Sequence, residues 1–183
     1  MRLYWKQADC IDPDPVLTQL PPDRAARILR CRTAAERQRL AAAGLLLAEC
    51  FGPEAVKTIA RTAEGKPYLP NGPHFSLSLS GSLAVLLTSD LPCGVDVEPV
   101  SRTLPPRMQE KLLLPEELAA RRAFAWFWTR KEAVMKLTGF GLGLSSRAFS
   151  VLPSEISLSG RRIRLGTQLV CGHFISWAVE ISS

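Results

Sequence analysis

Three carboxylates and one lysine stand at spacings that could build a phosphate-transfer site. Glu132 lies four residues after Trp128 and four before Lys136, so on a helix the three side chains share one face. Asp96 and Glu98 are two residues apart, so on a strand they project from the same side. Hard oxygen donors suit Mg²⁺, and a nearby lysine suits the negative charge of a diphosphate. One metal ion between the two elements would therefore favour transfer of a phosphorylated group.

The segments around these residues have the periodicities of the required strand and helix. Over residues 93–98, Val95 and Val97 alternate with the two acids, which predicts a strand with one face in the core and its carboxylates facing a cleft. A helix is predicted over residues 115–137, because acids directly follow its first proline and Gly139 follows its end. The aromatic residues inside that helix are expected to be mostly core.

The other elements are predicted from capping residues and short apolar segments. Thr33 and Glu36 fit a capping box at the start of a helix, and Gly52-Pro53 fits its end. Strands are predicted at residues 56–61, 75–79, 83–88 and 93–98, which could form one antiparallel sheet, and at residues 148–152, 161–165 and 173–181, which could close a second.

Less specific interpretations of the same residues stand beside the functional one. The three acids could be ordinary surface groups, and Glu132 and Lys136 could be no more than a stabilising pair on a helix. Lys131 lies one step around the helix from Glu132, and phosphate binding and simple surface exposure suit it equally.

The motifs resemble those of a known family in kind and in order. They are Gly65-Lys66-Pro67, then residues 75–80 (FSLSLS), 94–98 (GVDVE) and 128–136 (WTRKEAVMK), followed by residues 139–142 (GFGL). Over residues 33–151 the chain is similar to the 4'-phosphopantetheinyl transferase superfamily, in particular to the larger single-chain members of the type that activates surfactin synthetase.

The resemblance implies a fold, a reaction and partners. The fold would be α+β, with two similar small lobes in a pseudo-two-fold arrangement around an active-site cleft. The first lobe would comprise residues 1–99, with the residues that bind coenzyme A and the strand of Asp96 and Glu98. The second would comprise residues 100–183, with the C-terminal strands and the helix that contains residues 128–136, which we call the motif helix. The reaction would move the 4'-phosphopantetheine arm of coenzyme A, the co-substrate, to a serine of an apo acyl or peptidyl carrier protein, with Mg²⁺ as cofactor. Relatives of this type usually work as monomers.

The resemblance also assigns the chemical centre. Asp96, Glu98 and Glu132 match the metal ligands, and Asp96 also belongs to the coenzyme-binding side. Glu132 matches the base that takes the serine proton, directly or through water. Lys136 matches the lysine that contacts the diphosphate and assists the leaving group.

Four further positions match segments that bind the coenzyme in relatives. Lys66 and Pro67 match the segment that lines the adenosine end. Ser78 and Ser80 match the serines of the next motif, near the phosphates. Taken alone, residues 64–67 would be an ordinary turn.

The chain departs from the family pattern on the coenzyme side. Ser76 stands where asparagine is usual, and Leu79 stands where a histidine ordinarily helps hold a phosphate. Residues 41–45 also lack the basic residue that relatives often place there. We expect a weakened or rearranged grip on the terminal phosphate, for which Arg37, Arg39 or the arginines among residues 24–32 could compensate. The alternative is a catalytically weak or inactive coenzyme A-binding regulatory protein.

Charge and composition narrow the partners. With 183 residues, 46% of them hydrophobic, the chain can bury one shared core, and its net charge of +6 favours acidic partners. An acidic carrier protein is the expected one, with Arg107, Met108 and Lys111 as candidate docking residues. The sequence has no stacking or groove-binding motif for nucleic acid.

Several other classes are also disfavoured by the sequence. The five cysteines are widely spaced and form no CxxC pair, which predicts neither a disulfide framework nor a zinc site. No apolar run has the length of a membrane span, and the first residues do not resemble a signal peptide. A cytoplasmic protein without a membrane partner is therefore expected.

Overall fold

The computed structural model describes residues 1–139 and 144–182, so Phe140, Gly141 and Leu142 of the last motif lie outside the described residues. The elements follow one another as β1 (Arg2–Gln7), α1 (Asp14–Leu17), α2 (Pro22–Leu29), α3 (Ala34–Phe51), α4 (Pro53–Lys57), β2 (Ala60–Arg61), β3 (Pro67–Tyr68), β4 (His74–Ser80), β5 (Leu83–Ser89) and β6 (Cys93–Pro99). They continue as α5 (Pro106–Leu112), α6 (Pro115–Ala119), α7 (Phe124–Thr138), β7 (Glu155–Leu158), β8 (Arg161–Val170) and β9 (His173–Glu180).

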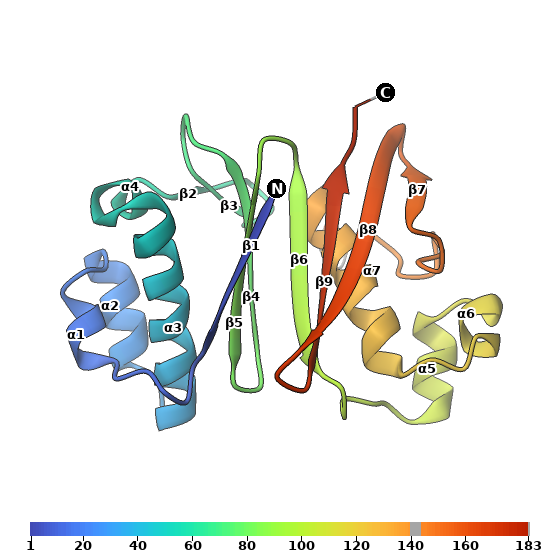
Figure 1. Cartoon of the computed structure of the whole chain (residues 1–183), viewed down its shortest axis with the longest axis horizontal. Coiled ribbons are helices and arrows are strands. Elements are labelled where there is room, and N and C mark those ends of the chain that lie inside the picture. Colours follow the sequence, from blue (N-terminus) through green and yellow to red (C-terminus); the bar gives the residue numbers. More distant parts are fainter. Residues whose placement is uncertain (140–143, 183) are drawn as a thin grey trace.

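The elements form four layers, with helices on the two outer sides and two antiparallel sheets between them (Figure 1). Helix α3 packs against a sheet with strand order β1-β5-β4, and α1, α2 and α4 pack against α3. Helix α7 packs against a sheet with order β6-β9-β8-β7, and α5 and α6 lie on the same side of the molecule as α7. A fold that mixes helices and antiparallel sheets is thus confirmed. The pseudo-two-fold relation of two lobes around a cleft stays a prediction.

The carboxylate strand lies in a different sheet from the one expected. Strand β6 pairs with β9, so that Asp96 stands opposite Ser176 and Glu98 opposite Phe174, and it has no backbone ladder with β4 or β5. The local pattern of a strand indicates which face is apolar, but it does not predict which strand pairs with it, here one about eighty residues along the chain.

The apolar side of β6 fills the space between the two sheets. Val95 and Val97 are buried in one cluster with Leu83, Val85 and Leu87 of β5. The predicted alternation is therefore confirmed, because the valines enter the core and the two acids turn to the opposite side, toward α7.

Helix α3 begins and ends where its capping residues predict. The Thr33 hydroxyl accepts a hydrogen bond from the Glu36 backbone N–H at 3.2 Å, and Gly52 with a φ of 82° follows the last turn. Its Leu47 packs against the first sheet, and Ala41 packs against α1 and α2.

The strand predicted at residues 56–61 is wrong for most of its length. Residues 53–57 form helix α4, and only Ala60 and Arg61 pair as β2. Pro53 at the first helical position and Glu54 in the first turn favour the helix, which buries Val56 on one side. Short apolar segments of this kind do not distinguish strand from helix by periodicity.

The helix predicted at residues 115–137 is two helices. Helix α6 ends at Ala119, Arg121 takes a left-handed φ of 51°, and α7 starts at Phe124. The break lets the Glu117 carboxylate accept a hydrogen bond from the Leu114 backbone N–H at 2.8 Å and meet Lys131 of α7 at 2.9 Å, with both side chains fully buried.

Residues 148–152 do not form the predicted strand. Their backbone groups are bonded by side chains instead: Val151 N–H donates to Glu117 at 2.9 Å, and Arg130 Nε donates to the Val151 carbonyl at 2.7 Å. Lys131 Nζ donates to the Phe149 carbonyl at 2.9 Å. A segment whose donors and acceptors are satisfied in this way needs no strand partner.

Two further features are described by the structure. None of its helices, within the described residues, is long and apolar enough to cross a membrane. All five cysteines are free, with Cys31 and Cys93 buried and Cys10 and Cys171 exposed.

Candidate active site

Helix α7 approaches the carboxylate strand closely because Gly94 has no side chain. A Cβ atom at this position would lie 2.0 Å from the Ala133 carbonyl oxygen and 2.5 Å from the Leu137 backbone nitrogen, so no other residue fits without moving the helix. The close approach brings the next two residues on this face, Asp96 and Glu98, beside the motif helix.

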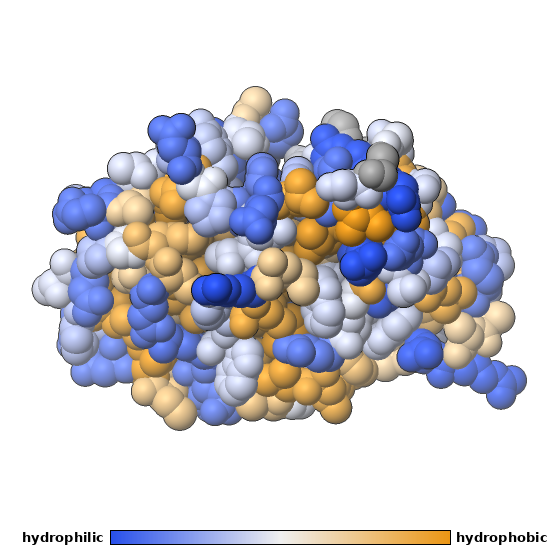
Figure 2. All heavy atoms as spheres, turned by 45° about the horizontal axis from the view of Figure 1, so that its top comes forward, coloured by the Kyte–Doolittle hydropathy of each residue, from blue (hydrophilic) through white to orange (hydrophobic). Residues whose placement is uncertain are grey.

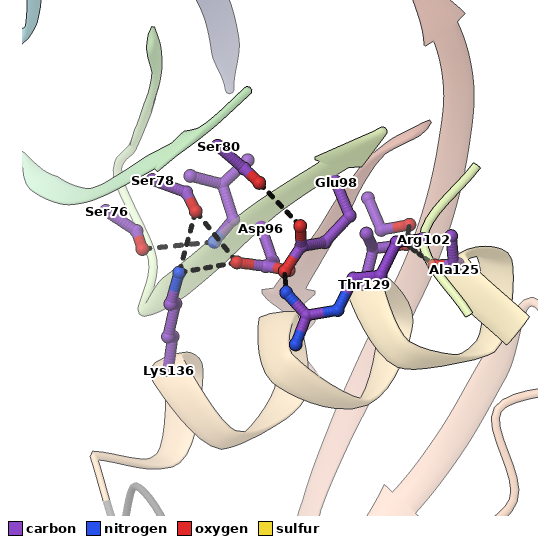
Figure 3. A network of polar contacts seen from close by, with 11 residues as sticks. Ser76, Ser78, Ser80, Asp96, Glu98, Arg102, Ala125, Thr129 and Lys136 are labelled. Carbon is purple, nitrogen blue, oxygen red and sulfur yellow. Dashed lines mark hydrogen bonds and ion pairs between the residues drawn. The ribbon is translucent and has the colours of Figure 1, made fainter. Parts of the chain in front are cut away.

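Asp96 is held by groups from two different elements. Its Oδ1 atom accepts a hydrogen bond from Ser78 Oγ of β4 at 2.7 Å and lies 2.7 Å from Lys136 Nζ of α7. Lys136 Nζ is also 2.9 Å from Ser78 Oγ, which closes a triangle of polar contacts (Figure 3). Asp96 is 6% exposed, and its second oxygen, Oδ2, is buried without a hydrogen-bond partner among the described residues.

Glu98, unlike Asp96, is paired on both of its oxygens. Oε2 accepts a hydrogen bond from Ser80 Oγ at 2.5 Å, and Oε1 meets the guanidinium of Arg102 (Figure 3). Burial raises the pKa of the Glu98 carboxyl group, while the Ser80 hydrogen bond and the charge of Arg102 act in the opposite direction. Arg102 therefore favours the ionised carboxylate.

A row of three serines on β4 joins the edge strands of the two sheets. Ser76, Ser78 and Ser80 alternate along β4 and point toward β6, as Figure 3 shows. Ser76 Oγ accepts from the Val95 backbone N–H at 3.0 Å, and the other two donate to the acids. The serine side chains thus bridge two edge strands that share no backbone ladder. At position 76, where asparagine is usual in the family, the serine hydroxyl accepts the hydrogen bond from Val95.

Glu132 faces the same space from α7. A hollow of about 380 Å³ is lined by Asp96, Glu98, Arg102, Trp128, Glu132 and Lys136, with residues 77–79 and Val97 along its edge; we call it the carboxylate hollow. Burial, and next the charge of Asp96, raise the pKa of the Glu132 carboxyl group. The structure therefore brings together the catalytic and metal-binding side chains that the sequence predicts.

The carboxylates suit a hard cation by chemistry but are not arranged as a finished metal site. In the described part of the chain, no three His, Cys, Asp or Glu side chains stand close enough together to hold an ion. Lys136 and Arg102 instead neutralise Asp96 and Glu98. The buried, unpartnered Oδ2 of Asp96 is the feature that fits a cation, because a lone buried carboxylate oxygen is costly.

The predicted coenzyme residues divide between two environments. Pro67 lines two neighbouring hollows beside the carboxylate hollow. The Lys66 ammonium instead points inward and donates to the carbonyls of Cys93 and Leu137 at 3.0 and 3.1 Å. Burial lowers the pKa of Lys66. Ser78 and Ser80 contact the acids of β6, as described above.

Two further hollows adjoin the carboxylate hollow, since Leu77 lines all three. One of about 230 Å³ is lined by residues 64–67, Met135 and Lys136. The other, of about 310 Å³, lies between α2, α3, α4 and β4 and carries Arg24, Arg27 and Arg61; we call it the arginine hollow. Leu79 lines both the arginine hollow and the carboxylate hollow.

Two residues of the site, Arg102 and Arg61, are not predicted from the sequence. Arg102 follows β6 in a turn, where its N–H donates to the Pro99 carbonyl at 2.9 Å, and this turn returns the side chain to Glu98. Its spacing of four residues from Glu98 would indicate contact only on a helix. Arg61 lies in a two-residue strand, and no periodicity marks it.

Comparison with known proteins gives matches to one family. The sequence profile of the 4'-phosphopantetheinyl transferase superfamily matches residues 92–181. The chain is 33% identical over 102 residues to "4'-phosphopantetheinyl transferase psf-1" of Bacillus pumilus and 33% identical over 97 residues to "4'-phosphopantetheinyl transferase Sfp" of Bacillus subtilis (strain 168). These alignments cover 50% and 48% of this chain and 43% of each relative, so the match spans less than half the length of these relatives. The matched region contains strand β6 and helix α7, and over this region the chain is similar to the 4'-phosphopantetheinyl transferase superfamily.

Proposed function

We propose that the chain moves the 4'-phosphopantetheine arm of coenzyme A to a serine of an apo acyl or peptidyl carrier protein. One observation carries the proposal: Asp96, Glu98, Glu132 and Lys136 line a single hollow although they come from two elements. The names of the relatives agree with this activity. The division into lobes of residues 1–99 and 100–183 with the site between them is part of the same proposal.

The arginine hollow is the proposed end for the nucleotide of coenzyme A. Burial is the largest cause that lowers the pKa of Arg24; the charge of Asp23 raises this pKa, and the charges of Arg61 and Arg27 lower it, so the three cations lie within electrostatic reach of one another. None of them forms an ion pair among the described residues. Asp23 also lines the hollow, but three cations beside one acid still favour a phosphate group, which accepts charge-assisted hydrogen bonds from arginine. Arg24 and Arg27 would then compensate for the missing histidine at Leu79.

The carboxylate hollow is the proposed place of the diphosphate. Asp96, Glu98 and Glu132 are the residues that would hold Mg²⁺, which when bound neutralises phosphate oxygens. Lys136 would orient the diphosphate and stabilise the negative charge on the departing oxygen. Glu132 would accept the proton of the attacking serine, directly or through a water molecule.

The carrier protein is expected to be acidic, because the chain has a net charge of +6. The predicted docking residues lie on α5, where Met108 is 49% exposed and no residue of the helix is buried. On the face shown in Figure 2, strongly hydrophilic side chains break the hydrophobic surface into separate areas. Hydrophobic surface on that face therefore does not locate the site that binds the carrier protein. The expectation of an acidic carrier rests on the net positive charge of the chain. A monomeric state and a cytoplasmic location stay predictions.

A catalytically weak coenzyme A-binding regulator is the second candidate. Leu79 favours it, since this side chain lines the arginine hollow and cannot donate a hydrogen bond. The pairing of Lys136 with Asp96 and of Arg102 with Glu98 also agrees with a site whose charges are satisfied without substrate.

Intact-mass measurement tests the proposal. The purified protein is incubated with Mg²⁺, coenzyme A and a panel of apo carrier proteins, beside a Glu132→Gln variant. We expect one phosphopantetheine arm to be added to at least one carrier by the wild type and none by the variant. If no carrier gains mass while coenzyme A still binds, the regulatory function replaces the transferase.

A further inference from the structure

The side chain of Lys66 runs from a turn in the N-terminal half to two carbonyls at the end of the motif helix and the start of the carboxylate strand. It comes from the loop between β2 and β3, whose ends pair in a short hairpin. Its Nζ donates to the carbonyl oxygen of Cys93, the first residue of β6, at 3.0 Å. The same atom donates to the carbonyl of Leu137, in the last turn of α7, at 3.1 Å.

The backbone that carries Lys66 is held in place independently of any ligand. The Thr62 N–H donates to the Lys66 carbonyl at 2.9 Å, and the Lys66 N–H donates to Thr62 Oγ1 at 3.3 Å. Gly65 takes a φ of 85°, and Arg61 donates to its carbonyl at 2.8 Å. A turn closed on both sides fixes the direction in which the lysine leaves it.

The two acceptors of Lys66 explain why an ammonium is placed there. The carbonyls in the last turn of a helix have no partner within the helix, and that end carries partial negative charge. A lysine donating to Leu137 O both satisfies a carbonyl and interacts favourably with the helix dipole. No carboxylate of the described chain lies within ion-pair distance of Lys66. The ammonium is therefore directed to the helix end and the strand.

Both acceptors are next to residues of the site. Leu137 directly follows Lys136, and Cys93 lies three residues before Asp96 on β6. The contact between Lys136 and Asp96 depends on the relative placement of helix and strand, and Lys66 joins the two at that end. A displacement of about 1 Å at a reacting group can lower a rate by about 100-fold.

We infer that the Lys66 ammonium is a clamp that positions Lys136 against Asp96, rather than a ligand of the coenzyme. Pro67 lines both neighbouring hollows and residues 64–66 line one of them, so this segment would still lie beside the coenzyme. Only the expected effect of Lys66 on turnover rests on the proposed transferase function. The effect on the helix end is a property of the chain itself.

Three variants separate a clamp from a ligand. Lys66→Met removes both hydrogen bonds and keeps the apolar stem, Lys66→Arg keeps a cation that can donate to carbonyls, and Arg24→Gln is the matched variant for a direct coenzyme contact. Hydrogen exchange of the amides in the last turn of α7 and the dissociation constant for coenzyme A without carrier are measured for each, together with kcat and KM.

We expect Lys66→Met to speed exchange in the last turn of α7 and to lower kcat about 10- to 100-fold. Its dissociation constant for coenzyme A should stay within about twofold of the wild type, whereas that of Arg24→Gln should rise about tenfold or more. Lys66→Arg should keep the exchange protection. If Lys66→Met does not fold, Lys66→Gln, which retains one donor group on a shorter stem, is measured in the same way.

The opposite pattern would overturn the inference. Weaker coenzyme A binding in Lys66→Met with unchanged exchange would make Lys66 a ligand and not a clamp. Exchange and coenzyme binding do not require turnover, so both are read even if the wild type modifies no carrier. Absence of transfer by the wild type would instead count against the proposed function.

Discussion

Lys136 Nζ lies 2.7 Å from Asp96 Oδ1, and this contact joins the motif helix to the carboxylate strand. The partner of Lys136 is therefore an acid of β6, and no ion pair with Glu132, four residues earlier on the helix, is formed in the described chain. This arrangement differs from a simple stabilising pair on a helix face. The Glu132 carboxyl group lines the hollow, where burial and next the charge of Asp96 raise its pKa.

Replacing Lys136 should damage turnover more than coenzyme binding. Lys136→Met removes the cation that is placed to stabilise charge on the departing oxygen, and losing one such donor typically costs about 100- to 1,000-fold in kcat. Steady-state kinetics with a responsive carrier would measure it. Lys136→Arg keeps the charge in a bulkier group and should retain more activity. Equal kcat values for Lys136→Met and the wild type would remove Lys136 from the chemistry.

Mg²⁺ should stabilise the folded protein in the absence of any substrate. A ligand that binds only the folded state raises the melting temperature as its concentration exceeds the dissociation constant. We expect a rise of a few degrees, about 2–4 °C, at saturating Mg²⁺. Asp96→Asn and Glu132→Gln should lose the rise. If both variants respond like the wild type, the cation binds elsewhere.

The raised pKa of Glu132 gives a pH-dependent prediction for the metal-free protein. Burial and the charge of Asp96 disfavour the ionised form in the folded state, so ionised Glu132 destabilises the fold above this raised pKa. As the pH falls through the raised pKa, the carboxyl group takes up a proton and the penalty disappears. Glu132→Gln should therefore be more stable than the wild type at pH 8, with the difference shrinking toward about pH 4, near the ordinary pKa of glutamate.

Urea unfolding in the presence of a chelator measures this difference. The variant and the wild type are compared at several pH values, and the free energy of unfolding of each is obtained from the transition. A variant that is less stable at pH 8, or a difference that does not change with pH, would contradict the raised pKa.

The local parts of the site were open to prediction from the sequence, and the long-range parts were not. The alternation of Val95 and Val97 with the acids shows which face of β6 is polar, and the spacing of Glu132 and Lys136 puts both on one helix face. Nothing local indicates that β6 pairs with β9, or that the Lys66 ammonium ends at Leu137. Such contacts depend on how the layers pack.

The strand predicted at residues 148–152 and the continuous helix predicted at residues 115–137 are wrong for the same reason, because long-range contacts decide both segments. Residues 148–152 have the apolar character of a strand, yet their backbone is bonded to Glu117, Arg130 and Lys131 from helices. The buried pair of Glu117 and Lys131 also explains why a helix predicted as continuous is broken. A buried ion pair between two helices leaves no periodic signal in the sequence.

Breaking this buried pair should destabilise the fold. Glu117 and Lys131 are 2.9 Å apart and fully buried, and removing one partner of such a pair typically costs about 3–5 kcal/mol of unfolding free energy. Lys131→Met should therefore lower the urea midpoint strongly. The double variant Glu117→Gln, Lys131→Met should lose less than the sum of the two single variants, because no unpaired charge remains. Additive losses would show that the two side chains do not interact.

Changing Leu79 should alter recognition of the terminal phosphate of coenzyme A. Leu79 lines the arginine hollow beside Arg24 and Arg27, so the imidazole of Leu79→His would point a hydrogen-bond donor into a space that already favours anions. We expect the dissociation constant for coenzyme A to fall about tenfold, in line with one hydrogen bond to a charged group. The constant for dephosphocoenzyme A, which lacks the 3'-phosphate, should change little.

Calorimetric titration with coenzyme A and with dephosphocoenzyme A separates a contact with the 3'-phosphate from a general gain in affinity. Leu79→Asn, which is polar but carries no charge at any pH, is the matched control and should improve binding less than Leu79→His. The improvement with Leu79→His should also be larger at pH 6 than at pH 8, because the imidazolium form adds a charge to the contact. An equal gain for both ligands would place the terminal phosphate outside the arginine hollow, and Arg24 and Arg27 would then not be the groups that replace the missing histidine.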